Sequence, residues 1–291
     1  MMRSHNNYRT TYFRHEIVNR HYLKWSASIL EKQLLTVESS GLSVIGPVRK
    51  ENQDAILLPN GQDSSSAGLY AVADGMGGYA QGSLASKVAL ETFSRKFFEK
   101  INPDPQTLHR GIESANIEVY LAAQRLGVGR MGTTLTAAYI LDGTVYLVHV
   151  GDSRAYLIHN GRALCLTADH TNVGSMVRAK LISPDKVRTH ALRSILTKTI
   201  GLGLFVQGDI SQHKLHAGDH LILCTDGIWS VIQDDEFAKL VKDNLTPAEI
   251  SQKLIDLALQ RETDDNASVI VLHVRQLSPA LAENKRLKNS G

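Results

Sequence analysis

Five aspartates stand beside short apolar runs, where a β-strand would deliver each of them to the edge of a sheet. Asp74 ends the run Leu69–Ala73 and opens a glycine-rich stretch, Asp74-Gly75-Met76-Gly77-Gly78. The others in comparable positions are Asp54, Asp152, Asp226 and Asp265. Clustered carboxylates repel one another, so their convergence would be costly without cations. Oxygen-only ligands favour Mg²⁺ or Mn²⁺. The pattern predicts a divalent-cation site, although each aspartate alone also suits a turn or a cap.

The glycine-rich stretch is expected to end its strand, because glycine is costly inside a strand and permissive in a turn. An Asp-Gly turn is the ordinary use of such a pair. The two interpretations are compatible, since a turn would present both the Asp74 carboxylate and the Gly75 carbonyl to a cation. None of the 12 histidines stands with these five aspartates in an H-x-x-x-H or Cys/His ligand pairing, which disfavours zinc at that site.

The elements that carry these residues are antiparallel strands and pairs of helices. Asp142-Gly143 and Asn160-Gly161 are hairpin signals, so the segments around them should pair as antiparallel strands. Strands are expected at 42–46, 55–58, 69–73, 134–141, 144–150, 154–159, 163–167, 208–214, 220–225 and 267–274. Helices are expected at 83–101, 107–126, 234–241 and 247–260. Helix pairs between groups of strands favour sheets with helices packed outside over a doubly wound parallel sheet.

The composition is that of an ordinary globular protein. Of 291 residues, 43% are hydrophobic and 21% charged, and the net charge of +3 is too small to imply a nucleic-acid partner. Cys165 and Cys224 lie in apolar runs and are expected to be buried, with nothing to suggest a disulfide scaffold. No apolar stretch is long enough to span a membrane, and no secretory signal is present. We therefore expect a cytoplasmic monomer.

The first 36 residues differ from the rest of the chain. They hold six basic and two acidic residues, which gives 6 − 2 = +4. This segment is either a docking arm for an acidic partner, a membrane surface or nucleic acid, or a loosely packed extension. A third possibility is that translation begins near residues 34–37. A polar tail is expected at 277–291, which leaves 37–276 as the folded domain.

Seven motifs in order resemble the type 2C serine/threonine phosphatases, the metal-dependent protein phosphatase family, in its bacterial form. They are Arg49–Ala55, Asp74–Gly78, Gly132-Thr133-Thr134, Gly151–Ala155, Asp169-His170, Thr225–Trp229 and Asp264–Ser268. One such motif would be weak, but the ordered set, which spans about residues 40–274, is highly specific. The resemblance implies an α+β fold, a four-layer αββα sandwich of two antiparallel β-sheets flanked by helix pairs.

The resemblance also implies a mechanism. Two Mn²⁺ or Mg²⁺ ions would be held by Asp54, Asp74, the Gly75 carbonyl, Asp226 and Asp265. A hydroxide that bridges the ions would attack phosphoserine or phosphothreonine directly, with no phosphoenzyme. Arg49 would bind the substrate phosphate through its planar guanidinium. Asp152 is similar to the aspartate of a third, weaker metal site in bacterial members.

Three residues depart from the family pattern. Met76 replaces a histidine proposed as general acid in animal members, Gln53 replaces a frequent glutamate, and Ser230 replaces an additional aspartate. The leaving serine oxygen would then take its proton from a metal-bound water or from another group, for which His170 is one candidate. Residues 170–204 resemble a mobile flap beside the site in bacterial members, where it would gate access.

Three functions follow from these observations. The first is a phosphatase that acts on phosphorylated proteins and opposes a cognate serine/threonine kinase. The second is a catalytically weak, phosphoprotein-binding regulator, against which the complete aspartate set and Arg49 argue. The third is an adaptor that binds nucleic acid or membrane through residues 1–36, with steeply salt-dependent binding.

Overall fold

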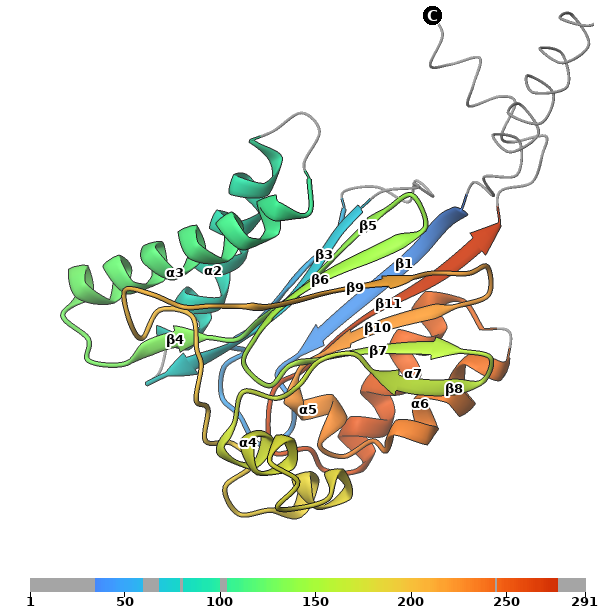
Figure 1. Ribbon diagram of the computed structural model, residues 1–291. Helices are drawn as coiled ribbons and strands as arrows, with labels where there is room; N and C mark the ends of the chain where they lie inside the picture. Colours follow the sequence, from blue (N-terminus) through green and yellow to red (C-terminus); the bar gives the residue numbers. More distant parts are fainter. Residues whose placement is uncertain (1–34, 60–67, 79–80, 100–103, 244, 277–291) are drawn as a thin grey trace, which may run out of the picture. The chain divides into compact units, whose positions relative to one another are not determined.

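Two β-sheets form the centre of the computed structural model, which describes residues 35–59, 68–78, 81–99, 104–243 and 245–276 (Figure 1). Residues 35–275 form one compact unit. The tail at 277–291 lies outside the described residues, as does the N-terminal segment except for its last two residues, Leu35 and Thr36. The division into extension, domain and tail stays a prediction.

The first sheet has five strands in the order β1-β11-β10-β7-β8. Their bounds are β1 Leu35–Val44, β7 Arg154–His159, β8 Arg162–Cys165, β10 His220–Cys224 and β11 Ala267–Gln276. The second sheet has the order β2-β3-β5-β6-β9, with β4 paired to β3. Its strands are β2 Asp54–Leu57, β3 Gly68–Gly77, β4 Met131–Thr133, β5 Leu135–Leu141, β6 Thr144–Val150 and β9 Asp209–Lys214. All strand pairs with a described register are antiparallel.

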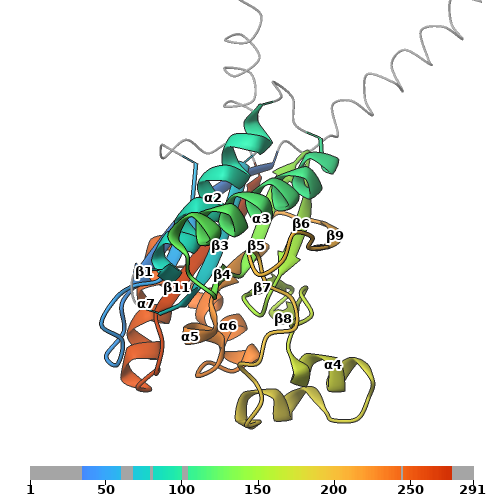
Figure 2. The same cartoon turned by 90° about the vertical axis from the view of Figure 1, so that its left-hand side faces the viewer.

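Helices cover the outer face of each sheet (Figures 1 and 2). On the six-stranded sheet lie α2 Gln81–Phe98 and α3 Gln106–Leu126. On the five-stranded sheet lie α5 Asp226–Trp229, α6 Asp234–Leu240 and α7 Pro247–Gln260. A capping box of Thr246 and Glu249 opens α7, with Pro247 in its first turn. A short helix α4 Asn172–Arg178 and a 3₁₀ turn η1 Pro184–Thr189 lie within the predicted flap, and a second 3₁₀ turn η2 Val241–Asp243 follows α6.

Three apolar clusters hold the four layers together. One packs the helix residues Phe93 and Ile112 against the six-stranded sheet, and a second packs Phe237 and Leu254 against the five-stranded sheet. The third lies between the sheets. In β10, Leu221 and Leu223 belong to the cluster between the sheets and Ile222 to the helix-side cluster, as alternation along a strand requires. Both faces of β10 are therefore buried, which explains its unbroken apolar sequence.

The structure confirms the α+β sandwich and corrects several local expectations. The first strand begins at Leu35 instead of residue 42, and the four-residue helix α5 was not predicted. Cys224 is buried as expected, whereas Cys165, at the end of the edge strand β8, is only half-buried; both are free thiols. Among the helices that the structure describes, none is long and apolar enough to cross a membrane.

The expectation that β3 stops at its glycines is wrong. The strand continues to Gly77 because the short strand β4 pairs with it, with Gly75 opposite Thr133. Between β4 and β5 the ladder is bridged by Thr134, whose backbone N–H donates to the Asp74 carbonyl at 2.8 Å. The Thr134 hydroxyl accepts the Asp74 N–H at 2.9 Å. Asp74 therefore lies within a strand, and Thr134 binds both its backbone N–H and its carbonyl.

Candidate metal centre

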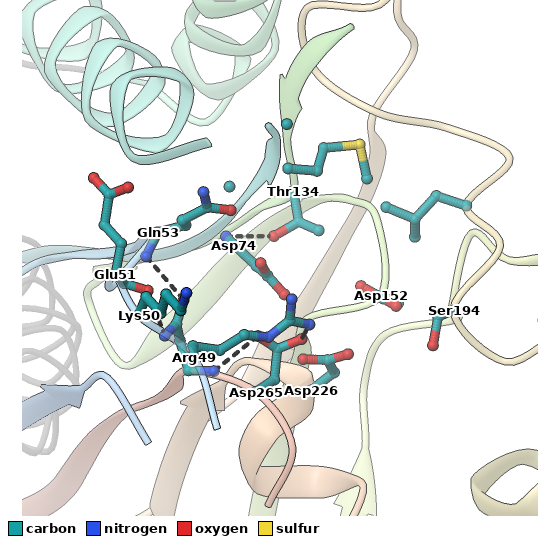
Figure 3. A pocket seen from close by; sticks show the side chains of 15 residues that line it. Arg49, Lys50, Glu51, Gln53, Asp74, Thr134, Asp152, Ser194, Asp226 and Asp265 are labelled. Atoms are coloured by element: carbon teal, nitrogen blue, oxygen red, sulfur yellow. Dashed lines mark hydrogen bonds and ion pairs between the residues drawn. The ribbon is translucent and has the colours of Figure 1, made fainter. Parts of the chain in front are cut away.

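Four of the five predicted aspartates meet in one cavity of about 370 Å³ (Figure 3). Asp74 comes from β3, Asp152 follows β6, Asp226 opens α5 directly after β10, and Asp265 precedes β11. Because β3 and β6 belong to one sheet and β10 and β11 to the other, the cavity lies where strand ends of both sheets come together. This convergence is what the strand-end pattern predicted.

Asp54 is buried opposite Asp74 in the β2–β3 ladder and is not among the residues that line this cavity. One of its carboxylate oxygens, Oδ2, accepts hydrogen bonds from the hydroxyls of Thr225 at 2.8 Å and Ser268 at 2.6 Å. Sequence reasoning missed these two positioning residues. The available signal was their place in the motifs around Asp226 and Asp265.

Four carboxylates here, those of Asp54, Asp74, Asp152 and Asp226, have raised pKa values and so resist ionisation. Burial raises the pKa of Asp54 to about 6 and the pKa of Asp152 to about 7. Burial is also the main cause that holds the pKa values of Asp74 and Asp226 well above the usual range, and neighbouring carboxylates raise them further. Bound cations would reverse this penalty by favouring the ionised form.

The donor set fits divalent cations that bind oxygen. Asp54 Oδ1 and Asp226 Oδ1 are both buried with no hydrogen-bond partner among the described residues. A buried acceptor left without a donor costs about 1–3 kcal/mol, and a cation would satisfy it. Within the described part of the chain, no three of these carboxylates bring oxygens within 4.8 Å of one another.

Gly75 is required here for space. A Cβ atom at this position would lie 2.0 Å from the Gly82 carbonyl oxygen and 2.6 Å from that of Gln53. The Gly75 N–H donates to the Gln53 carbonyl at 3.1 Å, which joins β3 to the segment before β2. The predicted role of the Gly75 carbonyl as a ligand stays a prediction.

Arg49 lies on the rim of the cavity with about half of its side chain exposed. Its guanidinium donates to Asp265 Oδ2 at 2.6 Å and to the Asp264 carbonyl at 3.1 Å (Figure 3). Asn266 fixes the segment that carries Arg49, because its side chain donates to the carbonyls of Ile45 and Glu51 and accepts the Gln53 N–H. An exposed planar cation is therefore held beside the carboxylates.

Arg154 is not among the residues that line the cavity, and it is connected to them through Trp229. Its guanidinium makes two hydrogen bonds to the buried Asp169 carboxylate, at 2.9 and 2.7 Å, and lies 3.6 Å from the centre of the Trp229 ring. The indole N–H of Trp229 donates to the Asp152 carbonyl at 2.9 Å. Arg154 thus acts on the site only through its neighbours.

The flap contributes Ser194 and Leu196 to the cavity wall, and Met76 also lines the cavity. The Met76 thioether has no proton to donate. His170 is buried and is not among the lining residues; its Nδ1 accepts the Gly151 N–H at 3.1 Å, and its Nε2 lies 3.1 Å from Asp209. The suggestion that His170 replaces the animal histidine is therefore wrong for this conformation.

Residues 48–260 match the family model described as protein phosphatase 2C. The chain belongs to the protein phosphatase 2C family. This confirms the resemblance, and with it the prediction of a protein serine/threonine phosphatase. The serine/threonine phosphatase stp of Listeria monocytogenes is 30% identical over 233 residues, which cover 78% of this chain and 92% of that protein.

Solved structures of bacterial type 2C phosphatases have the same fold. The serine/threonine phosphatase of S. agalactiae is 29% identical, with a TM-score of 0.75 and coverage of 81% of this chain and 99% of that one. The catalytic domain of PstP, described in complex with two manganese ions, is 28% identical, with a TM-score of 0.72 and coverage of 83% and 100%.

Proposed function

We propose that this type 2C phosphatase requires divalent metal and hydrolyses phosphoserine and phosphothreonine in proteins, in opposition to a serine/threonine kinase. The observation that carries the proposal is the cavity in which four aspartates meet, together with the unpartnered buried oxygens of Asp54 and Asp226. The two manganese ions of the PstP catalytic domain support Mn²⁺ as the ion and two as the number. The cytoplasmic location, the monomeric state and the kinase partner stay predictions.

The chain's own residues divide the work of binding and positioning. Mn²⁺ or Mg²⁺ would be held by Asp54, Asp74, the Gly75 carbonyl, Asp226 and Asp265, with Asp152 at a third site. Bound cations of this kind supply an activated water and neutralise charge on the phosphoryl group. Thr133 and Thr134 hydrogen-bond the Asp74 backbone, and the Trp229 indole donates to the Asp152 carbonyl. These bonds position Asp74 and Asp152 before any ion binds.

Arg49 would bind and orient the substrate phosphate. In the structure its guanidinium pairs with Asp265, so a phosphate must take over this cation from the carboxylate. The exchange would release Asp265 from its ion pair for the metal and place a bidentate donor on the phosphoryl oxygens. One residue thereby links substrate binding to the ligand set.

The proposal is tested by metal removal. The full chain is assayed with p-nitrophenyl phosphate and with phosphoserine, phosphothreonine and phosphotyrosine peptides, in Mn²⁺, in Mg²⁺ and in EDTA. We expect turnover of the serine and threonine peptides in Mn²⁺, its loss in EDTA and its return when Mn²⁺ is restored. Turnover that resists EDTA would contradict the metal-dependent mechanism. Tight phosphopeptide binding with no turnover in any metal would favour the regulator.

Replacing Arg49 by alanine should lower kcat/KM for phosphopeptides about ten- to a hundredfold, since hydrogen bonds between charged groups contribute about 1.5–3 kcal/mol. Lysine at this position should recover part of the loss, because it keeps the charge without the planar fork. Arg125→Ala, at an exposed arginine of α3, is the matched control and should keep full kcat/KM. Equal kcat/KM for Arg49→Ala and Arg125→Ala would exclude Arg49 from phosphate binding.

A further inference from the structure

A second group of metal-binding side chains lies at the other end of β10 from the aspartate cavity. It consists of His159, His216 and Asp219, each of which offers one ligand atom within 4.8 Å of the other two. Asp219 directly precedes β10, whereas Asp226 lies two residues after its last residue, Cys224. Seven residues of mostly extended chain place the two sites roughly 20 Å apart. The three residues therefore form a site distinct from the candidate metal centre.

The fold brings this group together from two turns. His159 ends β7, and β7 pairs with β10 so that Ile158 lies opposite His220. His216 lies in the connection from β9 to β10, two strands of different sheets (Figure 1). The backbone N–H of His216 donates to Asp219 Oδ2 at 2.8 Å, which folds this connection back onto the carboxylate. Strand pairing and turn closure thus fix all three ligands.

The side chains face one another at short range. His159 Nδ1 lies 2.7 Å from Asp219 Oδ1, and His216 Nδ1 lies 3.6 Å from Asp219 Oδ2. The centres of the two imidazole rings are 5.0 Å apart. The Asp219 side chain is only 4% exposed, while those of His159 and His216 are 43% and 64% exposed. The carboxylate is therefore held in place, and the imidazoles leave the group open to an ion from solvent.

We propose that His159, His216 and Asp219 bind a transition-metal ion of the Zn²⁺ class. Two imidazole nitrogens and one carboxylate oxygen are a ligand set that zinc and its neighbours in the first transition row prefer. Mg²⁺ prefers all-oxygen sites, so the two sites of this chain select different ions. A site with three protein ligands leaves a position for water.

The neighbour of His159 is compatible with this role. The Asn160 side-chain amide lies 2.9 Å from His159 Nε2. While the His159 Nδ1–H donates to Asp219, the unprotonated Nε2 accepts from the Asn160 NH₂ group. When Nδ1 binds a metal, the proton resides on Nε2, and rotation of the amide presents the Asn160 oxygen to accept it. The proton stays on the ring, and both hydrogen-bonding states are satisfied.

The ion would connect two parts of the chain. At this surface the structure already joins them through the contact between His159 and Asp219. One is the β7–β8 hairpin of the five-stranded sheet, and the other is the connection by which the chain passes from the six-stranded sheet to β10. Binding to the folded state alone raises stability with ion concentration. The site is therefore a structural metal site that stabilises the folded state, and it is independent of phosphate hydrolysis.

The test is a Co²⁺ titration of the full chain in excess Mg²⁺, followed by the visible absorption of nitrogen-ligated Co²⁺ and by its displacement with Zn²⁺. His216→Ala removes one exposed ligand, and His109→Ala is the matched control, because the His109 side chain is 41% exposed and outside the group. We expect the wild type and His109→Ala to bind one more Co²⁺ than His216→Ala, with affinity for this site reduced at least tenfold in the variant. Identical stoichiometry and affinity in all three would overturn the proposal.

Thermal unfolding gives an independent readout without turnover. Zn²⁺ added in excess Mg²⁺ should raise the melting temperature of the wild type and of His109→Ala, and should leave that of His216→Ala unchanged. Without Zn²⁺, His216→Ala and wild type should melt together, because the His216 side chain is mostly exposed. His159→Ala should also lose the Zn²⁺ effect. A Zn²⁺-dependent shift that persists in both histidine variants would assign the ion to other residues and overturn the proposal.

Discussion

Asp226→Asn is expected to lower Mn²⁺-dependent turnover of a phosphopeptide about a thousandfold, with the fold intact. The substitution keeps the size of the side chain and the backbone bond from the Ser230 N–H to the Asp226 carbonyl. It removes the negative charge that a divalent cation requires, and metal catalysis contributes several kcal/mol, each 1.36 kcal/mol being a factor of ten. The measurement is kcat/KM over a range of Mn²⁺ concentrations.

The same variant should be more stable than the wild type when metal is absent. The folded-state pKa of Asp226 is raised by burial and then by neighbouring carboxylates, so the charged form weakens the folded state. For a raised carboxyl pKa, stability is greatest at low pH and is lost as the pH rises through the folded value. Asparagine cannot ionise. Urea unfolding in EDTA should therefore show a gap between variant and wild type that widens from mildly acidic to mildly alkaline pH.

Asp235→Asn is the matched control for both measurements. Asp235 is exposed on α6, pairs with Lys239 at 2.6 Å and lies outside the cavity. It should keep wild-type turnover and gain no stability, since exposed ion pairs contribute about 0–1 kcal/mol. Turnover of Asp226→Asn within tenfold of the wild type would remove Asp226 from the ligand set.

The sequence predicted the aspartates better than the groups that hold them. An aspartate after an apolar run can be located from local pattern alone, and four of these aspartates do meet in one cavity. Thr225 and Ser268 could not be assigned in this way, because their hydroxyls bind Asp54 across 171 and 214 residues of sequence. Such contacts depend on sheet order, which periodicity does not encode.

The error at β3 has a similar origin. Glycine propensity favoured a stop at Asp74, and propensity is a local quantity. The ladder continues because β4, more than fifty residues later, supplies a partner for Gly75, Met76 and Gly77. Tertiary pairing outweighed the cost of glycine, and the result places Asp74 inside the sheet.

The group of His159, His216 and Asp219 could not be predicted from local sequence pattern. His216 and His220 are four residues apart, a spacing that joins ligands on a helix. Here the segment is a turn that leads into β10, where His220 is buried and stacks on His273. The partner of His216 is His159, 57 residues earlier, so no local pattern could indicate the site. Asp219 joins them because the turn folds back on itself.

Arg154→Met should lower the free energy of unfolding by about 3–5 kcal/mol, the largest stability loss that we expect from a single charge removal in this chain. Both side chains of the Arg154–Asp169 pair are less than a tenth exposed. Methionine fills similar space but leaves the Asp169 carboxylate buried without its cation. The loss should appear in urea unfolding as a lower midpoint with an unchanged slope.

Arg261→Met is the control that separates the effect of burial on stability from the effect of bidentate ion-pair geometry. Arg261 also binds a carboxylate through two nitrogens, at 2.7 and 2.6 Å, but this pair with Glu236 is more exposed. Its loss should cost about 1 kcal/mol or less. Equal losses for Arg154→Met and Arg261→Met would mean that burial adds nothing to the cost of breaking the Arg154 pair.

The double variant Arg154→Met with Asp169→Leu should regain much of the stability, because no buried charge then remains unpaired. It should not regain full activity. Arg154 also lies over Trp229, whose indole N–H holds the Asp152 carbonyl, and methionine cannot replace that planar contact. We therefore expect the double variant to need a higher Mn²⁺ concentration for half-maximal activity than the wild type, even where its stability is restored. That result would separate the role of Arg154 in positioning the metal centre from its role in the fold. If the Mn²⁺ concentration for half-maximal activity returns to the wild-type value together with stability, Arg154 serves the fold alone.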